Sequence, residues 1–162
     1  MPAANEPIAV NTGPLIALAA CDAIDLLRRL HSHVLVPTAV VEEFCRGRSG
    51  ESTGLPAWFD VRTLATPVPP MLVTHLNAGE ASAIALALEA RIRLAAMDER
   101  RGRFVARYMG LTVTGSVGVL LRAKRLGLIE AVGPRLTAMR RNGIWIGEAL
   151  VGRVLLEAEE SA

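Results

Sequence analysis

Residues 8–20 read IAVNTGPLIALAA, in which a short apolar run is followed by a turn and then by a second apolar run. The apolar residues 8–10 predict a strand, and residues 11–14 carry Asn, Gly and Pro, which are typical of turns. Residues 15–20 are compatible with a helix, because Pro14 is tolerated in a first helical turn. The stretch therefore predicts a strand that leads through a turn into a helix.

The same order of elements continues along the chain. Further strands are predicted at residues 33–36, 58–64, 92–97 and 111–113. Helices are predicted at residues 23–30 (capped by Asp22), 38–46, 81–90, 99–108, 117–125, 130–140 and 148–157, with a polar loop at 47–56 and a proline-rich linker at 66–70. Short apolar strands that alternate with longer helices are typical of α/β proteins, in which a mainly parallel sheet is covered on both faces.

Composition limits the class of protein. A length of 162 residues with 51% hydrophobic residues suits one domain with a hydrophobic core. No apolar run approaches the roughly 18–20 residues that a membrane helix needs, and residues 1–10 do not resemble a secretory signal. Cys21 and Cys45 form no Cys-x-x-Cys pair, so we expect buried, reduced thiols and a cytoplasmic location.

Acidic and amide side chains follow the predicted strands. Asn11 and Asp98 each stand at the end of a strand, and Glu80 lies in the first turn of a helix. Glu43 is three residues after Val40, which places it on or beside the inward face of its helix, whereas Glu42 is rotated about 100° away. Because strand ends and the following helix starts share one edge of a parallel sheet, we expect Asn11, Glu43, Glu80 and Asp98 to converge there.

Clustered carboxylates repel one another unless a cation neutralises them. Oxygen ligands favour a hard divalent ion, Mg²⁺ or Mn²⁺, which activates water and stabilises charge on a phosphate during hydrolysis. Each residue also has a purely structural explanation. Glu80 is favoured by the helix dipole, Asp98 by capping the next helix, Glu43 by solvation and Asn11 by the turn.

Five motifs in chain order carry a resemblance to a known family. They are VNTGPLIAL at residues 10–18, VPTAVVEEF at 36–44, LNAGEASAIALA at 76–87, MDERR at 97–101 and VTGSVGVLL at 113–121. Together they resemble PIN-like domains of a prokaryotic family related to toxin–antitoxin ribonucleases, with matches from about residue 8 to residue 157. The resemblance implies a single domain with the three-layer α/β/α PIN fold and metal-dependent cleavage of single-stranded RNA. Its relatives include toxins that are silenced by a small antitoxin protein.

The motif match also implies the site residues. The acidic site carries over to Asn11, Glu43, Glu80 and Asp98, and small hydroxyl positions that border such sites carry over to Thr12 and Ser116, while Glu99 matches a position that is often acidic. This chain has Asn11 where a PIN site typically has Asp, which removes one negative charge and one anionic ligand. The alternative is therefore a catalytically impaired PIN-like module that binds nucleic acid or protein.

An arginine cluster follows Asp98 directly. Arg100, Arg103 and Arg107 share one helix face, and with Arg101 they form a cationic strip at the rim of the expected site, where an RNA backbone needs phosphate contacts. A solvated helix face balanced by acids explains the cluster equally well. Basic residues comprise 17 Arg and one Lys at a net charge of +2, a preference that compositional bias also explains.

The remaining features are less informative. Trp58 and Tyr108 are aromatic side chains of the kind on which bases stack, but we expect both in the core. The apolar faces within residues 144–155 allow either packing on the domain or a homodimer. The sequence has no dinucleotide fingerprint, phosphate-binding P-loop or hydrolase nucleophile elbow. Zinc is disfavoured by isolated cysteines and by the spacing of His31, His33 and His75.

Overall fold

A computed structural model describes residues 5–46 and 54–161. Within these residues a five-stranded sheet has the order β3-β2-β1-β4-β5, and every neighbouring pair of strands is parallel. The strands are β1 (Ile8–Val10), β2 (Val34–Pro37), β3 (Asp60–Arg62), β4 (Leu94–Ala96) and β5 (Thr112–Thr114). The helices are α1 (Thr12–Ala19), α2 (Leu26–Leu30), α3 (Thr38–Arg46), α4 (Pro70–His75), α5 (Ala78–Glu89), α6 (Arg100–Tyr108), α7 (Ser116–Arg125), α8 (Gly133–Arg141) and α9 (Glu148–Glu157).

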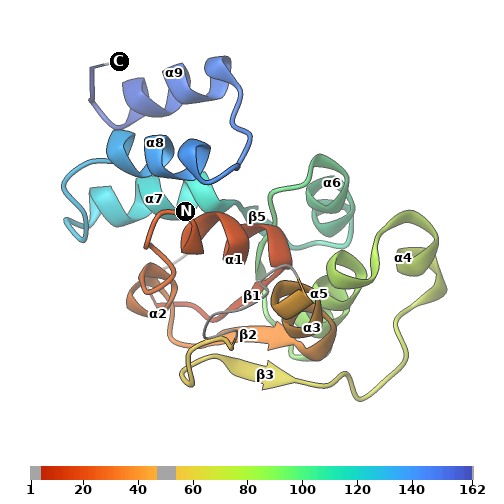
Figure 1. Ribbon diagram of the computed structural model, residues 1–162. Helices are drawn as coiled ribbons and strands as arrows, with labels where there is room; N and C mark the ends of the chain where they lie inside the picture. The colour runs from red at the N-terminus through yellow and green to blue at the C-terminus, as the bar shows by residue number, and fades with distance from the viewer. Residues whose placement is uncertain (1–4, 47–53, 162) are drawn as a thin grey trace.

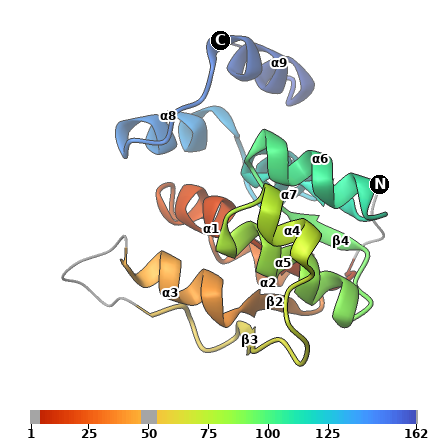
Figure 2. The same ribbon diagram turned by 90° about the vertical axis from the view of Figure 1, so that its right-hand side faces the viewer.

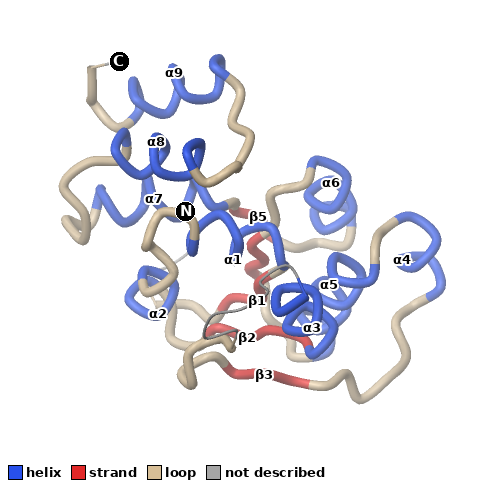
Figure 3. Tube along the Cα trace, in the orientation of Figure 1, coloured by secondary structure: helices blue, strands red, loops and turns tan. Residues whose placement is uncertain are grey.

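Helices cover both faces of the sheet, as Figures 1 and 3 show. Ile8 and Val10 of β1 point into a core shared with α1, α2 and α7, whereas Ala9 between them points into a second core with α5 and α6. The alternation follows from the two-residue period of a strand. Strands buried on both sides need apolar residues throughout, which explains why β1, β2 and β4 read as continuous apolar runs. The three-layer α/β/α prediction is confirmed.

Several element boundaries differ from the prediction, and three of these differences have a local cause. Helix α1 begins at Thr12, inside the expected turn, because Asn11 takes the extended N-cap position and Pro14 fits the first helical turn. Helix α2 is shorter than expected: Asp22 has a left-handed φ of 52° and does not cap it. Helix α4 begins at Pro70, within the expected linker, since proline is compatible with a first helical position. Of the predicted loop at 47–56, residues 47–53 lie outside the described residues.

Helices α8 and α9 form an additional layer over α7, on the side of the sheet that α1 also covers (Figures 1 and 2). Leu136 and Met139 of α8 and Val154 of α9 are buried in the core that includes α7. Residues 144–155 therefore contribute to the domain's own core, as one of the two predicted alternatives had it. Among the described residues, no helix combines the length and the apolar character required to cross a membrane.

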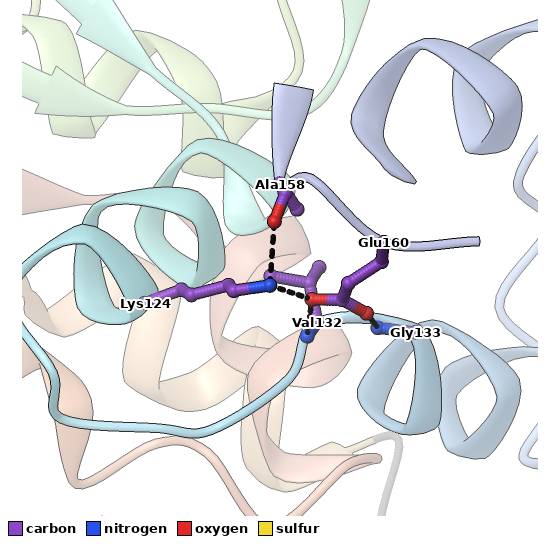
Figure 4. Close-up of polar contacts among 5 residues, drawn as sticks. All are labelled: Lys124, Val132, Gly133, Ala158 and Glu160. Carbon is purple, nitrogen blue, oxygen red and sulfur yellow. Dashed lines mark hydrogen bonds and ion pairs between the residues drawn. The ribbon is translucent and has the colours of Figure 1, made fainter. Parts of the chain in front are cut away.

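Glu160 links helices α8 and α9 to each other and to α7 (Figure 4). Its carboxylate accepts hydrogen bonds from the backbone N–H groups of Val132 (2.7 Å) and Gly133 (2.8 Å), at the start of α8. Lys124 of α7 donates to Glu160 Oε1 (2.6 Å) and to the carbonyl oxygen of Ala158 (2.5 Å), which follows α9. The Glu160 carboxylate thus connects the end of α9 to the start of α8 by hydrogen bonds and to α7 by an ion pair.

Replacing Glu160 with Gln is expected to lower the free energy of unfolding by about 1–3 kcal/mol. The reason is that the hydrogen bonds to this side chain would then be accepted by a neutral amide in place of a carboxylate. Burial raises the pKa of Glu160, but the hydrogen bonds from Lys124 and the backbone outweigh it and hold the pKa below the usual glutamate value. The stabilisation is therefore present above the ordinary pKa and is lost as the pH falls through the lowered pKa. Urea unfolding at several pH values measures it, with Glu159→Gln as the control at an exposed neighbour. Equal stability of Glu160→Gln and wild type at pH 7 would contradict the assignment.

Candidate active site

The candidate residues gather at the carboxyl edge of the sheet. Strands β1 and β4 pair directly, with Val10 opposite Ala96, and the Asn11 backbone N–H donates to the Ala96 carbonyl (3.0 Å). Asn11 and Asp98 therefore follow neighbouring strands at the same edge. Glu80 reaches this edge from the first turn of α5, and Glu43 reaches it from α3, which packs against α5.

One half of the site surrounds Gly79 of α5. The Thr12 hydroxyl donates to Glu43 Oε2 (2.7 Å), and Asn11 is buried with its Oδ1 lacking any hydrogen-bond partner among the described residues. A Cβ at Gly79 would lie 3.2 Å from Asn11 Oδ1 and 3.3 Å from Thr12 Oγ1, and it would overlap Glu43 Oε2. Three side-chain oxygens thus face one backbone position that only glycine fits.

Glu80 is buried beside this group. Its side chain accepts from the Asn77 backbone N–H (3.3 Å), while the Asn77 side chain accepts from the Glu80 backbone N–H (2.8 Å), so the two residues form a capping box. Burial raises the pKa of Glu80; the Asn77 hydrogen bond opposes this, and the negative charges of Glu99 and Glu43 raise the pKa further. The carboxylate is therefore in a place where added positive charge is favourable.

Asp98 forms the other half. It accepts a hydrogen bond from the Ser116 backbone N–H (2.7 Å) at the start of α7. The residue is exposed to solvent, but its carboxylate lies against the backbone of Gly115. A Cβ at Gly115 would come within 2.7 Å of Asp98 Oδ1. The partial loss of hydration raises the pKa of Asp98, hydrogen bonds from Ser116 and the charge of Arg103 oppose this, and Glu99 raises it.

The structure brings all four residues to one edge without placing them in direct contact. Glu43 contacts Thr12, whereas Asp98 contacts Ser116 and lies beside the first turn of α1. Within residues 5–46 and 54–161, no three His, Cys, Asp or Glu side chains form a group that could hold a metal ion. The assignment of Glu43, Glu80 and Asp98 as joint ligands therefore stays a prediction.

The comparison with protein families agrees with this arrangement. A family model described as a PIN domain matches residues 7–160. The chain belongs to the PIN-domain family. The resemblance of the five motifs to PIN domains is thereby confirmed. A PIN domain indicates a nuclease-type fold, suggests nucleic-acid binding and generally uses divalent metal ions. Comparison with curated proteins finds no match to this chain.

The oxygen atoms around Gly79 fit the divalent ion that PIN domains use. A buried amide oxygen without a hydrogen-bond partner is costly unless something binds it, and Asn11 Oδ1 is such an atom. It faces a carboxylate oxygen and a hydroxyl oxygen, which are hard ligands. Mg²⁺ commonly takes one or two carboxylates and completes its shell with water and substrate phosphate. The donor set of this PIN domain is therefore compatible with Mg²⁺ or Mn²⁺.

The four arginines of α6 do not form one exposed strip on this PIN domain. Arg100, Arg101 and Arg107 are exposed, but Arg103 is half-buried and donates to the Met97 carbonyl (2.8 Å). Burial lowers the pKa of Arg103, and the charge of Arg107 adds to this, while Asp98 opposes it. Arg103 therefore binds the backbone at the end of β4 and lies near the negative charge of Asp98. The sequence had predicted an exposed arginine that contacts phosphate.

The aromatic residues also differ from expectation. Trp58 stacks on Phe59 with ring centroids 4.0 Å apart and packs against the core, as predicted. Tyr108, expected in the core, is exposed at the end of α6, because it lies about 200° around the helix from the buried Ala106. Trp145, which the sequence reasoning did not consider, is 89% exposed and lines a groove together with Asp98. The sequence does contain a signal for Trp145, because an aromatic residue lies between Gly143 and Gly147 in the segment that joins two predicted helices.

Proposed function

We propose that this PIN domain is a metal-dependent ribonuclease that cleaves single-stranded RNA with Mg²⁺ or Mn²⁺. The observation that carries the proposal is the buried, unpartnered oxygen of Asn11, which faces Glu43 and Thr12 at the same sheet edge as Asp98. A buried polar atom without a partner in the protein marks a place for a bound ion or water. The carboxylate and hydroxyl oxygens that Asn11 faces favour a hard cation there.

The residues divide into ligands and positioning groups. Glu43, Asp98 and Asn11 would hold the cation, with Glu80 adding negative charge next to it. When bound, the ion would activate water and neutralise charge that develops on the phosphate. Because Asn11 is neutral where PIN sites typically carry Asp, the site depends more heavily on the remaining carboxylates.

The other side chains orient these groups. The Thr12 hydroxyl fixes one Glu43 oxygen through its 2.7 Å hydrogen bond, and the Ser116 backbone N–H fixes Asp98 Oδ1. The Ser116 hydroxyl also hydrogen-bonds Asp98 and lies at the start of α7, where backbone N–H groups favour anions. Arg100, Arg101 and Arg107 remain exposed and would contact the phosphates of the bound strand.

Removal of metal tests the proposal. Purified protein is incubated with a labelled single-stranded RNA in Mn²⁺, in Mg²⁺ and in excess EDTA. We expect cleavage with either ion, none in EDTA, and recovery when Mn²⁺ is added back, because the proposed reaction uses the bound ion to activate the water. Cleavage that persists in EDTA would indicate a contaminant or a different chemistry, and absence of cleavage with both ions would leave the binding-module function.

That binding module is the second candidate, and Asn11 favours it. Loss of one anionic ligand weakens the hold on a cation while leaving the fold and the exposed arginines intact. RNA binding with no cleavage, even after Asn11→Asp, would select it.

Two further parts of the proposal concern the cellular role and the oligomeric state. As the toxin of a toxin–antitoxin pair, the protein would arrest growth when expressed alone, and a small antitoxin encoded beside it would relieve the arrest. A homodimer is also part of the proposal, and sedimentation at several concentrations tests it.

A further inference from the structure

A groove of about 570 Å³ opens directly from the candidate site. Asp98 and Ser116 line it at one end, and the loop between α8 and α9 lines it at the other. Ile16 of α1 and Leu150 of α9, which are 39% and 38% exposed, contribute to its lining, and Arg100 adds a positive charge. The groove therefore combines apolar surface with one cation, Arg100, and two carboxylates, Asp98 and Glu99.

The Trp145 indole lines this groove and lies close to the backbone of Gly147. Gly147 allows a close approach, because a Cβ there would come within 3.3 Å of the ring carbon Cη2. The loop itself is anchored: Ile146 is buried, and Arg140 donates to the Ile146 carbonyl (2.7 Å) and to Glu148 (2.8 Å). Trp145 is thus an exposed aromatic side chain on a fixed backbone.

This combination needs an explanation. An indole that is 89% exposed gives up the stabilisation that burial of so large an apolar side chain supplies. A flat aromatic surface beside a cation is how proteins bind single-stranded nucleic acid, with a base stacked on the ring and a phosphate on the basic residue. A strand that reaches the candidate site beside Arg100 and Ser116 continues along the groove that these residues share with Trp145.

We propose that Trp145 is a stacking platform for one base of single-stranded RNA, in a nucleotide next to the candidate site. This inference rests on the proposed ribonuclease function. Arg100 neutralises the phosphate of that nucleotide, and Ile16 and Leu150 contact its base or sugar. The contact tolerates any base, because every base presents an aromatic face.

Binding in the absence of metal tests the platform separately from cleavage. A fluorescein-labelled single-stranded RNA is titrated with protein in EDTA, and both anisotropy and tryptophan emission are recorded. We expect RNA to quench the emission and Trp145→Ala to weaken binding about 5–150-fold, from the ~1–3 kcal/mol of one stacked base. Trp145→Phe should abolish the quenching and retain most of the affinity. An abasic nucleotide at one position of the strand should weaken binding to wild type by a similar factor and should have no further effect on Trp145→Ala.

Phe104→Ala is the matched control, because Phe104 is an aromatic residue of α6 that is 69% exposed and is not part of the groove lining. RNA binding that is equally strong in Trp145→Ala and wild type overturns the platform, and metal-dependent cleavage then still stands or falls by its own assay. A change in sedimentation of Trp145→Ala without a change in RNA affinity also overturns it, in favour of an interface with a second copy. No RNA binding by wild type in EDTA overturns the platform, and the cleavage assay with Mn²⁺ decides the ribonuclease function.

Discussion

Glu43→Gln and Asp98→Asn are each expected to lower the rate of RNA cleavage by about 10²–10³-fold, the scale seen when one electrostatic contact to a reacting group is lost. Both substitutions keep the size of the side chain and an oxygen that accepts the hydrogen bond from Thr12 or Ser116. They remove only the negative charge that holds a cation. We therefore expect the free energy of unfolding in EDTA to be unchanged or slightly higher.

Glu42→Gln is the matched control for Glu43→Gln, because Glu42 is the preceding residue of α3 and is exposed. It should cleave RNA at the rate of wild type. If Glu42→Gln and Glu43→Gln lost equal activity, the loss would come from α3 as a whole. If neither Glu43→Gln nor Asp98→Asn lost activity, the site would lie elsewhere.

Asn11→Asp is expected to lower the free energy of unfolding in EDTA by about 3–5 kcal/mol, the cost of leaving a buried charge without a partner. Asn11 is only 4% exposed and faces Glu43, so the new carboxylate would be both desolvated and repelled. Saturating Mn²⁺ should restore most of this stability and raise the cleavage rate above wild type, because a cation would then bind one more anionic ligand. Thermal unfolding with and without Mn²⁺ measures the first effect.

Asn5→Asp makes the same chemical change at an exposed position and should show neither effect. A loss of stability in Asn11→Asp that Mn²⁺ leaves unchanged would mean that Asn11 faces no cation site. A variant as stable as wild type in EDTA would mean that the Asn11 side chain is less enclosed than the structure shows.

Much of the fold follows from local sequence. Strands β1 and β4 are apolar at every position because both faces of the sheet are covered, and the capping box of Asn77 and Glu80 marks the start of α5. The start of α1 was harder to predict, because Asn, Gly and Pro favour turns as strongly as they fit a helix N-terminus. Helix α4 was hidden in the same way by prolines that suit its first turn.

The candidate site was predictable only to the level of the sheet edge. A parallel α/β sheet places Asn11, Asp98 and Glu80 at one edge whatever their side chains do. Side-chain contacts depend on packing across elements, so the sequence did not reveal that Arg103 turns inward to the Met97 carbonyl. It also did not reveal that the loop after α8 brings Trp145 beside Asp98, since these residues are far apart along the chain.

The proposed function requires a divalent cation at the carboxyl edge of this PIN domain. An anomalous-difference map from crystals soaked in Mn²⁺ locates such an ion. We predict a peak that contacts the carboxylate of Glu43 or Asp98 and the side-chain oxygen of Asn11. A map without a peak at this edge, at a Mn²⁺ concentration that supports full cleavage activity, would contradict it.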